Sequence, residues 1–370
     1  MTRVPSILVV TVVHDPEDSR IRYRQIPALL ADGWRVTYAA PFTAYDRPQP
    51  LLPGLRTMDL PRALGRDRLA ADRAARALIA AQGGEHDLVL VHDPEIVATG
   101  TGLRLRNLVW DVHEDPAAAL VAKDWLPRPA KGVIGRLWRG TERLTERRHR
   151  LLLAEYAYQE RFAREHAVVP NAVTVPATIE PPGTERVVYL GTVTMARGTG
   201  VMVEAARRIA AATEGSCRLE VIGGARDDAS RDLLEAGQRD GVLTWHGFVP
   251  AAEALAMLPG ALAGLSLLQN LPNYRHSRPT KIVEYLAHGV PVVTTPLPVA
   301  VDLVESANAG IVVPFDDPVA AADAILALRA DPERAATMGR AGHEAARAAY
   351  DWSVQGGHFT ETLRGFLAAP

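Results

Sequence analysis

Three short apolar runs in the first half of the sequence each end in a histidine beside an acidic residue. These sites are His14-Asp15, His92-Asp93 and His113-Glu114-Asp115. Imidazoles and carboxylates exchange protons near neutral pH, so such groups suit a polar catalytic or binding site. The alternative interpretation of each single site is structural, because these residue types also cap helices and bind loop backbone. No metal site is predicted, since each histidine adjoins its own carboxylate and no His-x-x-x-His spacing occurs.

Two helix starts carry cations that could bind anions. Arg20 follows Asp18-Ser19 at a helix start suited to a phosphate or carboxylate, and the alternative is a surface arginine paired with Asp18. Lys281 stands in the first turn of another helix, where the helix dipole disfavours a cation, so a bound anion explains it better than helix stability does. Glu284, one turn later, is placed to accept hydrogen bonds from a diol. Phosphate and diol together predict a nucleotide ribose and its diphosphate.

Alternating strands and helices must position these residues, and they predict an α/β fold with parallel sheets covered on both faces. The expected strands are 7–13, 34–39, 88–91, 108–112, 151–154, 167–169, 187–190, 218–222, 243–246, 262–267, 291–295 and 310–313. The expected helices include 21–30, 159–165, 199–212, 230–237, 279–287 and 352–367. Ligands of such sheets bind at the carboxyl ends of the strands, where the candidate residues stand.

A Pro-rich stretch at 176–182 divides this pattern into two Rossmann-like αβα domains. We expect an N-terminal domain over 1–166 and a C-terminal domain over 167–370, with a hinge near 165–185. The last helix, at 352–367, could pack back on the N-terminal domain.

Composition excludes several classes of protein. A length of 370 residues suits two domains, and a net charge of -2 argues against a nucleic-acid binder that relies on basicity. The single cysteine, Cys217, excludes an intramolecular disulfide framework and a cysteine-rich metal site, and it fits a cytoplasmic protein. No apolar stretch is long enough to span a membrane. The first strand is not followed by G-x-G-x-x-G and no Walker A loop occurs, which argues against dehydrogenases and P-loop enzymes.

The segment 279–293 has the pattern P-T-K-x-x-E-Y-x-A-x-G-x-P-V-V, and it resembles GT-B glycosyltransferases of the retaining family 4 type. Further matching segments are 18–20, 111–115, 168–173, 187–191, 197–198, 221–224 and 246–250. The resemblance implies two Rossmann-like domains facing a cleft (GT-B), with 1–166 as the acceptor-side domain and 167–370 as the nucleotide-sugar-binding domain. It also implies transfer of a sugar, with retention of configuration, from a nucleotide-diphosphate sugar to an acceptor hydroxyl. Neither a cofactor nor a metal is expected, and the implied setting is polysaccharide, glycoconjugate or natural-product biosynthesis.

The resemblance also assigns roles to individual residues. The implied catalytic residues are His113, Arg197 and Lys281, of which the two cations neutralise the diphosphate. The implied donor-binding residues are Gly191, Arg197, His276, Thr280, Lys281 and Glu284. The implied acceptor-side residues are His14, Asp15, Arg20, His92, Asp93 and Asp115. Two positions depart from the family pattern: His276 replaces the first Glu of the E-x7-E motif, and Thr192 replaces an arginine that often follows the strand glycine.

Other functions remain open on the same fold. A nucleotide-sugar 2-epimerase would convert the donor without an acceptor, and a non-catalytic protein would bind the nucleotide sugar without turnover. A pyridoxal-phosphate phosphorylase is disfavoured, because its only candidate lysine, Lys281, is expected to face solvent. The expected partners are the donor and a small-molecule, glycan or lipid-linked acceptor, without nucleic acid.

The segment 125–150 is rich in arginine and contains Trp138. It suits peripheral contact with an anionic membrane at the inner face, and the alternative is a solvated Arg/Glu helix face.

Overall fold

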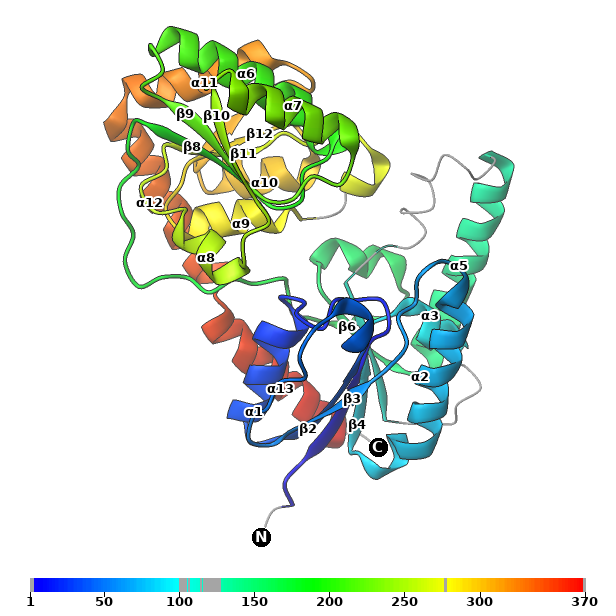
Figure 1. Ribbon diagram of the computed structural model, residues 1–370. Coiled ribbons are helices and arrows are strands. Elements are labelled where there is room, and N and C mark those ends of the chain that lie inside the picture. The colour runs from blue at the N-terminus through cyan, green and yellow to red at the C-terminus, as the bar shows by residue number, and fades with distance from the viewer. Residues whose placement is uncertain are drawn as a thin grey trace. The chain divides into compact units, whose positions relative to one another are not determined.

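The computed structural model describes residues 3–99, 105, 107–113, 115, 128–275 and 278–368. The chain forms two compact units (Figure 1). The first consists of Met1–Asn171 together with Ser353–Pro370, and the second of Ala172–Trp352. Each unit has one wholly parallel sheet with helices on both faces, which confirms the predicted fold class.

The first unit contains a seven-stranded sheet in the order β3-β2-β1-β4-β5-β6-β7. Its strands are β1 (Ser6–Val10), β2 (Arg35–Ala40), β3 (Leu55–Asp59), β4 (Leu88–Val91), β5 (Leu108–Val112), β6 (Arg150–Leu153) and β7 (Ala167–Val168). Its described α-helices are α1 (Ile26–Ala31), α2 (Arg68–Gln82), α3 (Pro94–Thr99), α5 (Arg128–Arg148) and α13 (Trp352–Ala368). Figure 1 shows α1 and α13 on one face of the sheet and α2, α3 and α5 on the other.

The C-terminal helix α13 belongs to the first unit from Ser353 onward. The Arg364 guanidinium fixes it there, because Nε donates to Asp32 Oδ2 (2.7 Å) and Nη2 donates to the Asp32 carbonyl (2.7 Å).

The second unit contains a six-stranded sheet in the order β10-β9-β8-β11-β12-β13. Its strands are β8 (Arg186–Leu190), β9 (Arg218–Ile222), β10 (Leu243–Gly247), β11 (Ala263–Ser266), β12 (Val292–Thr294) and β13 (Gly310–Val312). Its described α-helices are α6 (Thr199–Ala212), α7 (Asp228–Arg239), α8 (Ala251–Ala256), α9 (Thr280–Ala287), α10 (Pro298–Ser306), α11 (Pro318–Ala330) and α12 (Pro332–Ala349). Helices α6, α7 and α11 pack into one hydrophobic cluster, and α8, α9, α10 and α12 into another.

The strand order places one switch point in each sheet. In the first unit β1 lies between β2 and β4, and in the second β8 lies between β9 and β11. The chain leaves these neighbouring strands in opposite directions, so ligands of doubly wound sheets bind at the carboxyl ends of those strands. The predicted site residues follow β1, β4, β5, β8 and β11.

Several predicted elements differ from the structure. The helix predicted at 21–30 begins as a π-helical turn, Ile21–Gln25, before α1. The helix predicted at 159–165 is a 3-10 helix at Tyr156–Arg161. Strand β1 ends at Val10, because the Val12 and Val13 N–H groups donate to Asp93 rather than to a neighbouring strand. Neither β3 nor α2 was predicted. Within the described ranges, no helix is both long and apolar enough to cross a membrane.

Candidate functional site

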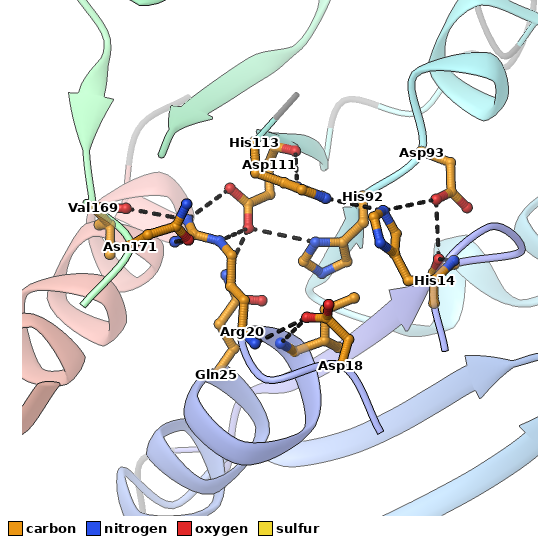
Figure 2. A network of polar contacts seen from close by, with 12 residues as sticks. His14, Asp18, Arg20, Gln25, His92, Asp93, Asp111, His113, Val169 and Asn171 are labelled. Atoms are coloured by element: carbon orange, nitrogen blue, oxygen red, sulfur yellow. Dashed lines mark hydrogen bonds and ion pairs between the residues drawn. The ribbon is translucent and has the colours of Figure 1, made fainter. Parts of the chain in front are cut away.

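Three histidines converge at the carboxyl ends of β1, β4 and β5 (Figure 2). His113 Nε2 and His14 Nε2 lie 2.9 Å apart, and His113 Nδ1 lies 3.1 Å from the Asp111 carbonyl oxygen. The His92 ring centroid lies 5.5 Å from that of His113 and 6.5 Å from that of His14. The structure therefore brings the three predicted imidazoles together, as parallel strand ends require. Burial lowers the pKa of His92 well below its ordinary value, so this imidazole is neutral.

Asp93 holds the loop that carries His14. Its fully buried carboxylate accepts hydrogen bonds from Thr11 Oγ1 (3.0 Å) and from the Val12 and Val13 N–H groups. Asp93 Oδ1 also lies 3.4 Å from His14 Nε2. Burial raises the pKa of Asp93 to about 6, although the His14 charge and the hydrogen bonds oppose this rise. The Asp93 carboxyl group, with a pKa of about 6, thus adjoins the imidazole pair of His14 and His113 on the side of His14.

Asp93→Asn is expected to remove a pH dependence of folding stability. Because the folded-state pKa of Asp93 is raised, its contribution to stability is present below about pH 4 and lost as the pH rises to about 6. The loss amounts to about 3 kcal/mol at full burial. Urea unfolding at a series of pH values should show this fall in the wild type and in the exposed control Asp59→Asn, but not in Asp93→Asn. Parallel curves for all three proteins would contradict the raised pKa.

A buried ion pair between Arg20 and Asp111 supports the same cluster. Arg20 Nε donates to Asp111 Oδ2 and Nη2 donates to Oδ1, each at 2.9 Å. The guanidinium also donates to the carbonyl of Val169 (3.1 Å) and to Oδ1 of Asn171 (3.1 Å). Burial acts to raise the pKa of Asp111, but the charge and hydrogen bonds of Arg20 hold it well below its ordinary range.

The alternative interpretation of Arg20 as a surface residue is wrong, and the anion that its guanidinium binds in the structure is the carboxylate of Asp111. Its guanidinium is buried and bound to Asp111, while Asp18 Oδ1 accepts the Arg20 and Ile21 N–H groups. The π-helical turn explains how two side chains reach one carboxylate, because Gln25 Nε2 also donates to Asp111 Oδ2 (2.6 Å). The Gln25 N–H donates to the Arg20 carbonyl, so residues five apart complete one turn. In an α-helix they would point about 140° apart.

The ligand atoms of His92, Asp111 and His113 lie within 4.8 Å of one another, which is close enough to hold a metal ion. The hydrogen-bond donors around Asp111 do not favour metal binding, because both carboxylate oxygens of Asp111 already accept N–H groups from Arg20 and Gln25. A metal ion would displace a buried cation that already neutralises the carboxylate. The cluster is therefore better described as imidazoles beside a buried Arg–Asp pair.

Two of the predicted acceptor-side carboxylates are bound by arginines instead of facing the imidazoles. Asp15 accepts from Arg47 Nε (3.2 Å) and Nη2 (3.1 Å), and the pair is about one third exposed. Asp115 accepts from Arg139 Nη2 (2.7 Å), on α5. Asp111 joins the imidazoles and was not predicted as a site residue. The signal in the sequence was that Asp111 is a single acidic residue inside an otherwise apolar strand. Because an unpaired buried charge is costly, such a residue indicates a buried partner.

In the second unit, Lys281 lies in the first turn of α9 with only 8% of the residue exposed. Its Nζ atom lies 3.5 Å from the centroid of the Tyr189 ring and has no hydrogen-bond partner in the described part of the chain. Burial, then the nearby charge of Arg197, lowers the pKa of Lys281 well below its ordinary value, whereas Glu284 acts to raise it. The expectation that Lys281 faces solvent is wrong. A buried amine without a partner indicates a site that an anion completes.

Tyr285 joins α9 to the strand ends at the switch point. Its hydroxyl accepts from the Leu190 N–H (2.8 Å) and donates to the Leu265 carbonyl (3.2 Å). Its ring packs so closely on Gly264 that a Cβ atom there would lie 2.4 Å from the ring. Tyr285 therefore fixes the start of α9 against β8 and β11. This positioning role was not predicted, because the contacts span 20 or more positions in sequence.

Arg197 ends a 3-10 turn, Met195–Arg197, in the loop after β8. Its Nη1 donates to the Thr192 carbonyl (3.4 Å), and its charge reaches Lys281. The next residue, Gly198, has φ 87°, and a Cβ atom there would lie 2.1 Å from the Leu267 carbonyl oxygen. Only glycine permits this turn, which directs Arg197 toward the start of α9.

The remaining predicted donor-side residues lie around the same helix start. Thr280 is the first residue of α9, and Pro279, which was expected inside the helix, precedes it without a side-chain cap. Glu284 follows one turn after Lys281 and is half-buried. Gly191 follows β8 with φ 109° and lies beside the Lys281 side chain. His276 lies outside the described residues. The structure thus collects the described donor-side residues at one switch point.

Residues 184–331, which include this helix and its loops, match the family described as glycosyl transferases group 1. The match covers 148 of the 370 residues and lies within the second unit. No curated protein matches the sequence. A pyridoxal-phosphate phosphorylase was disfavoured because Lys281 was expected to face solvent, and the structure overturns that reason. The match to the glycosyl transferases group 1 family now disfavours this enzyme class instead.

Solved structures share the fold of this glycosyltransferase over its whole length. A sucrose-phosphate synthase from Thermosynechococcus elongatus is 20% identical, with 100% of both chains covered and a TM-score of 0.78. HepE from Anabaena in complex with UDP is 13% identical, with 98% of this chain and 100% of that chain covered and a TM-score of 0.68. WaaG, a glycosyltransferase involved in lipopolysaccharide biosynthesis, is 12% identical, covers 95% and 97%, and has a TM-score of 0.69. At these identities the likeness shows the GT-B fold.

Proposed function

We propose that this glycosyltransferase moves a sugar from a nucleoside diphosphate sugar to an acceptor hydroxyl, with retention at the anomeric carbon. The observation that carries the proposal is the buried Lys281 amine near the charge of Arg197 at the start of α9, which has no hydrogen-bond partner among the described residues. Two cations and an uncapped helix N-terminus form a site for a doubly charged diphosphate. Glu284, one turn further along α9, is the proposed acceptor of hydrogen bonds from the ribose diol.

The chemical step breaks the bond between the anomeric carbon and the diphosphate oxygen, and negative charge develops on the leaving group. Arg197, Lys281 and the α9 N-terminus stabilise that charge, which lowers the barrier. The acceptor oxygen then bonds to the anomeric carbon on the face that the diphosphate leaves, and the acceptor hydroxyl gives its proton to the departing diphosphate oxygen. His113 is proposed to position or polarise the reacting groups, with His14 and Asp93 behind it. Because side chains neutralise the diphosphate, this scheme requires no metal.

The family and the structural neighbours support a choice of donor and setting. One neighbour, HepE, was solved with UDP, so a UDP-sugar is the first donor to test. WaaG acts in lipopolysaccharide biosynthesis, which supports polysaccharide or glycoconjugate biosynthesis as the setting. The acceptor is proposed to bind the first unit and to be a small molecule, a glycan or a lipid-linked sugar.

A thermal-shift panel of UDP-, GDP-, ADP- and dTDP-sugars tests the donor assignment. At a ligand concentration of about 100 Kd, the correct donor should stabilise the protein by about 2.7 kcal/mol, or raise its Tm by about 5 to 10 °C. Glu284→Gln should weaken binding of that donor about 10- to 100-fold, since a hydrogen bond to a charged group contributes about 1.5–3 kcal/mol. The exposed control Glu333→Gln on α12 should bind like the wild type.

Absence of a shift with every nucleotide sugar would overturn the donor site. Conversion of the donor alone into an epimer would favour a 2-epimerase, and binding without turnover across acceptors would favour a non-catalytic protein.

A further inference from the structure

Helix α5 buries its acidic side chains and exposes several apolar ones. The polar side chains that it buries are Glu142, Thr145 and Glu146. On the outside, Val133 is 55%, Leu137 67% and Leu144 39% exposed. Helices at the surface of globular proteins do the reverse, because burial of the apolar stripe stabilises them.

Ion pairs fix this orientation. The buried Glu142 carboxylate accepts from Arg139 Nη1 (2.8 Å) and from Arg161. The buried Glu146 carboxylate accepts from the Arg164 N–H (2.7 Å) and contacts His166 Nε2 at 3.0 Å. Rotation of α5 to bury its leucines would remove these carboxylates from the buried side chains of Arg161 and His166, and breaking a buried ion pair costs several kcal/mol. These ion pairs therefore hold the apolar stripe of α5 on the outside of the first unit.

The exposed face of α5 also carries cations and no acidic residue among its described side chains. Arg136, Arg143 and Arg147 are exposed, and none forms an ion pair with another described residue. Val133, Leu137 and Leu144 follow the helical spacing i, i+4, i+11, with the arginines beside them. The stripe is about 16 Å long, at 1.5 Å per residue. We call these six residues the outer face of α5.

We propose that the outer face of α5 docks the protein on an anionic lipid surface. A helix with leucines flanked by arginines lies in the membrane interface, with its apolar side chains below the headgroups and its cations among the lipid phosphates. Figure 1 shows α5 extending beyond its neighbour α3, and the exposed side chains of Val133, Leu137 and Leu144 leave this face accessible to a broad surface. A nucleic acid fits this face less well, because it offers leucines and no exposed aromatic side chain for stacking.

Vesicle flotation of the full-length protein tests the proposal and needs neither donor nor acceptor. The wild type should float with vesicles containing about one third phosphatidylglycerol and stay at the bottom of the gradient with phosphatidylcholine alone. High salt should reduce the floating fraction, since exposed charges are screened. A wild type that fails to float with the anionic vesicles overturns the proposal.

A pair of matched variants identifies the surface. Arg136→Glu combined with Leu137→Glu should weaken vesicle binding more than tenfold, since each arginine near an anionic surface contributes about a fivefold change. Leu69→Glu combined with Arg73→Glu, on the exposed side of α2, makes the same change of charge and should float like the wild type. Equal flotation of the two variants overturns the proposal.

Two further measurements keep the result interpretable. If Arg136→Glu with Leu137→Glu does not fold, Leu137→Ser replaces it, because this side chain is largely exposed. Light scattering measures the oligomeric state without vesicles. A dimer that the α5 variant dissociates, without any vesicle binding by the wild type, would assign the face to a second copy and overturn the lipid proposal. The nucleotide-sugar shift of folded variants should stay unchanged, which separates this result from failure of the proposed function.

Discussion

Lys281→Met is expected to lower kcat/KM about 100- to 1,000-fold while leaving the free energy of unfolding unchanged or higher. The loss follows because the lysine is proposed to stabilise charge on the departing diphosphate, and removal of one such donor typically costs this much. The stability follows from burial: Nζ has no hydrogen-bond partner among the described residues, and methionine keeps the apolar stem against Tyr189.

Steady-state kinetics with the donor found in the thermal-shift panel, together with urea unfolding, measures both effects. Arg197→Ala should show a loss of kcat/KM of similar size. Arg340→Met replaces an exposed cation on α12 and should retain full activity. Wild-type turnover in both Lys281→Met and Arg197→Ala would refute the diphosphate assignment.

The same lysine should make donor binding depend on pH. In the free protein the pKa of Lys281 is well below its ordinary value, and a bound diphosphate raises it by favouring the ammonium. The complex therefore takes up a proton, and donor affinity falls as the pH rises through the free-state pKa. Titration calorimetry in two buffers of different ionisation enthalpy should detect the proton uptake in the wild type and a smaller uptake in Lys281→Met.

Arg20→Met is expected to lower the free energy of unfolding by about 3–5 kcal/mol. The substitution leaves the wholly buried Asp111 carboxylate without its cation, and one broken buried ion pair costs about this much. Urea unfolding at neutral pH measures the loss. Arg47→Met breaks the partly exposed pair with Asp15 and should cost at most about 1 kcal/mol.

A second substitution and a pH series separate charge from packing. Arg20→Met combined with Asp111→Asn should recover part of the loss, because the buried charge is gone. In the wild type the depressed pKa of Asp111 gives a contribution that is present above about pH 4 and is lost only in stronger acid. Without Arg20, burial raises the pKa of Asp111, so the single variant should lose less stability in mild acid than at neutral pH. An equal loss at both pH values would contradict the buried-charge explanation.

The local sequence pattern was sufficient to predict the fold class and the strand ends at which the candidate site residues lie. Continuous apolar runs between helices predict parallel sheets, and the histidines after three such runs converge as expected. The P-T-K-x-x-E-Y segment predicted the start of α9 to within one residue. Helix capping, strand length and helical spacing depend on residues that are close in sequence, so the sequence alone predicts them.

Burial and partners were decided by tertiary structure. Arg20 was interpreted as an anion ligand or a surface residue, but it meets Asp111 across 91 positions of sequence. Lys281 was expected in solvent, but packing of β8 against α9 buries it on Tyr189. Glu142 on α5 points inward because Arg161 lies beneath it. The sequence gives the charge and hydrophobicity of each side chain. Its surroundings depend on which strands and helices, distant in sequence, pack against it. The sequence by itself therefore determined the two sheets and their candidate residues, and only the packing decided how far each of those residues is buried and which partners it contacts.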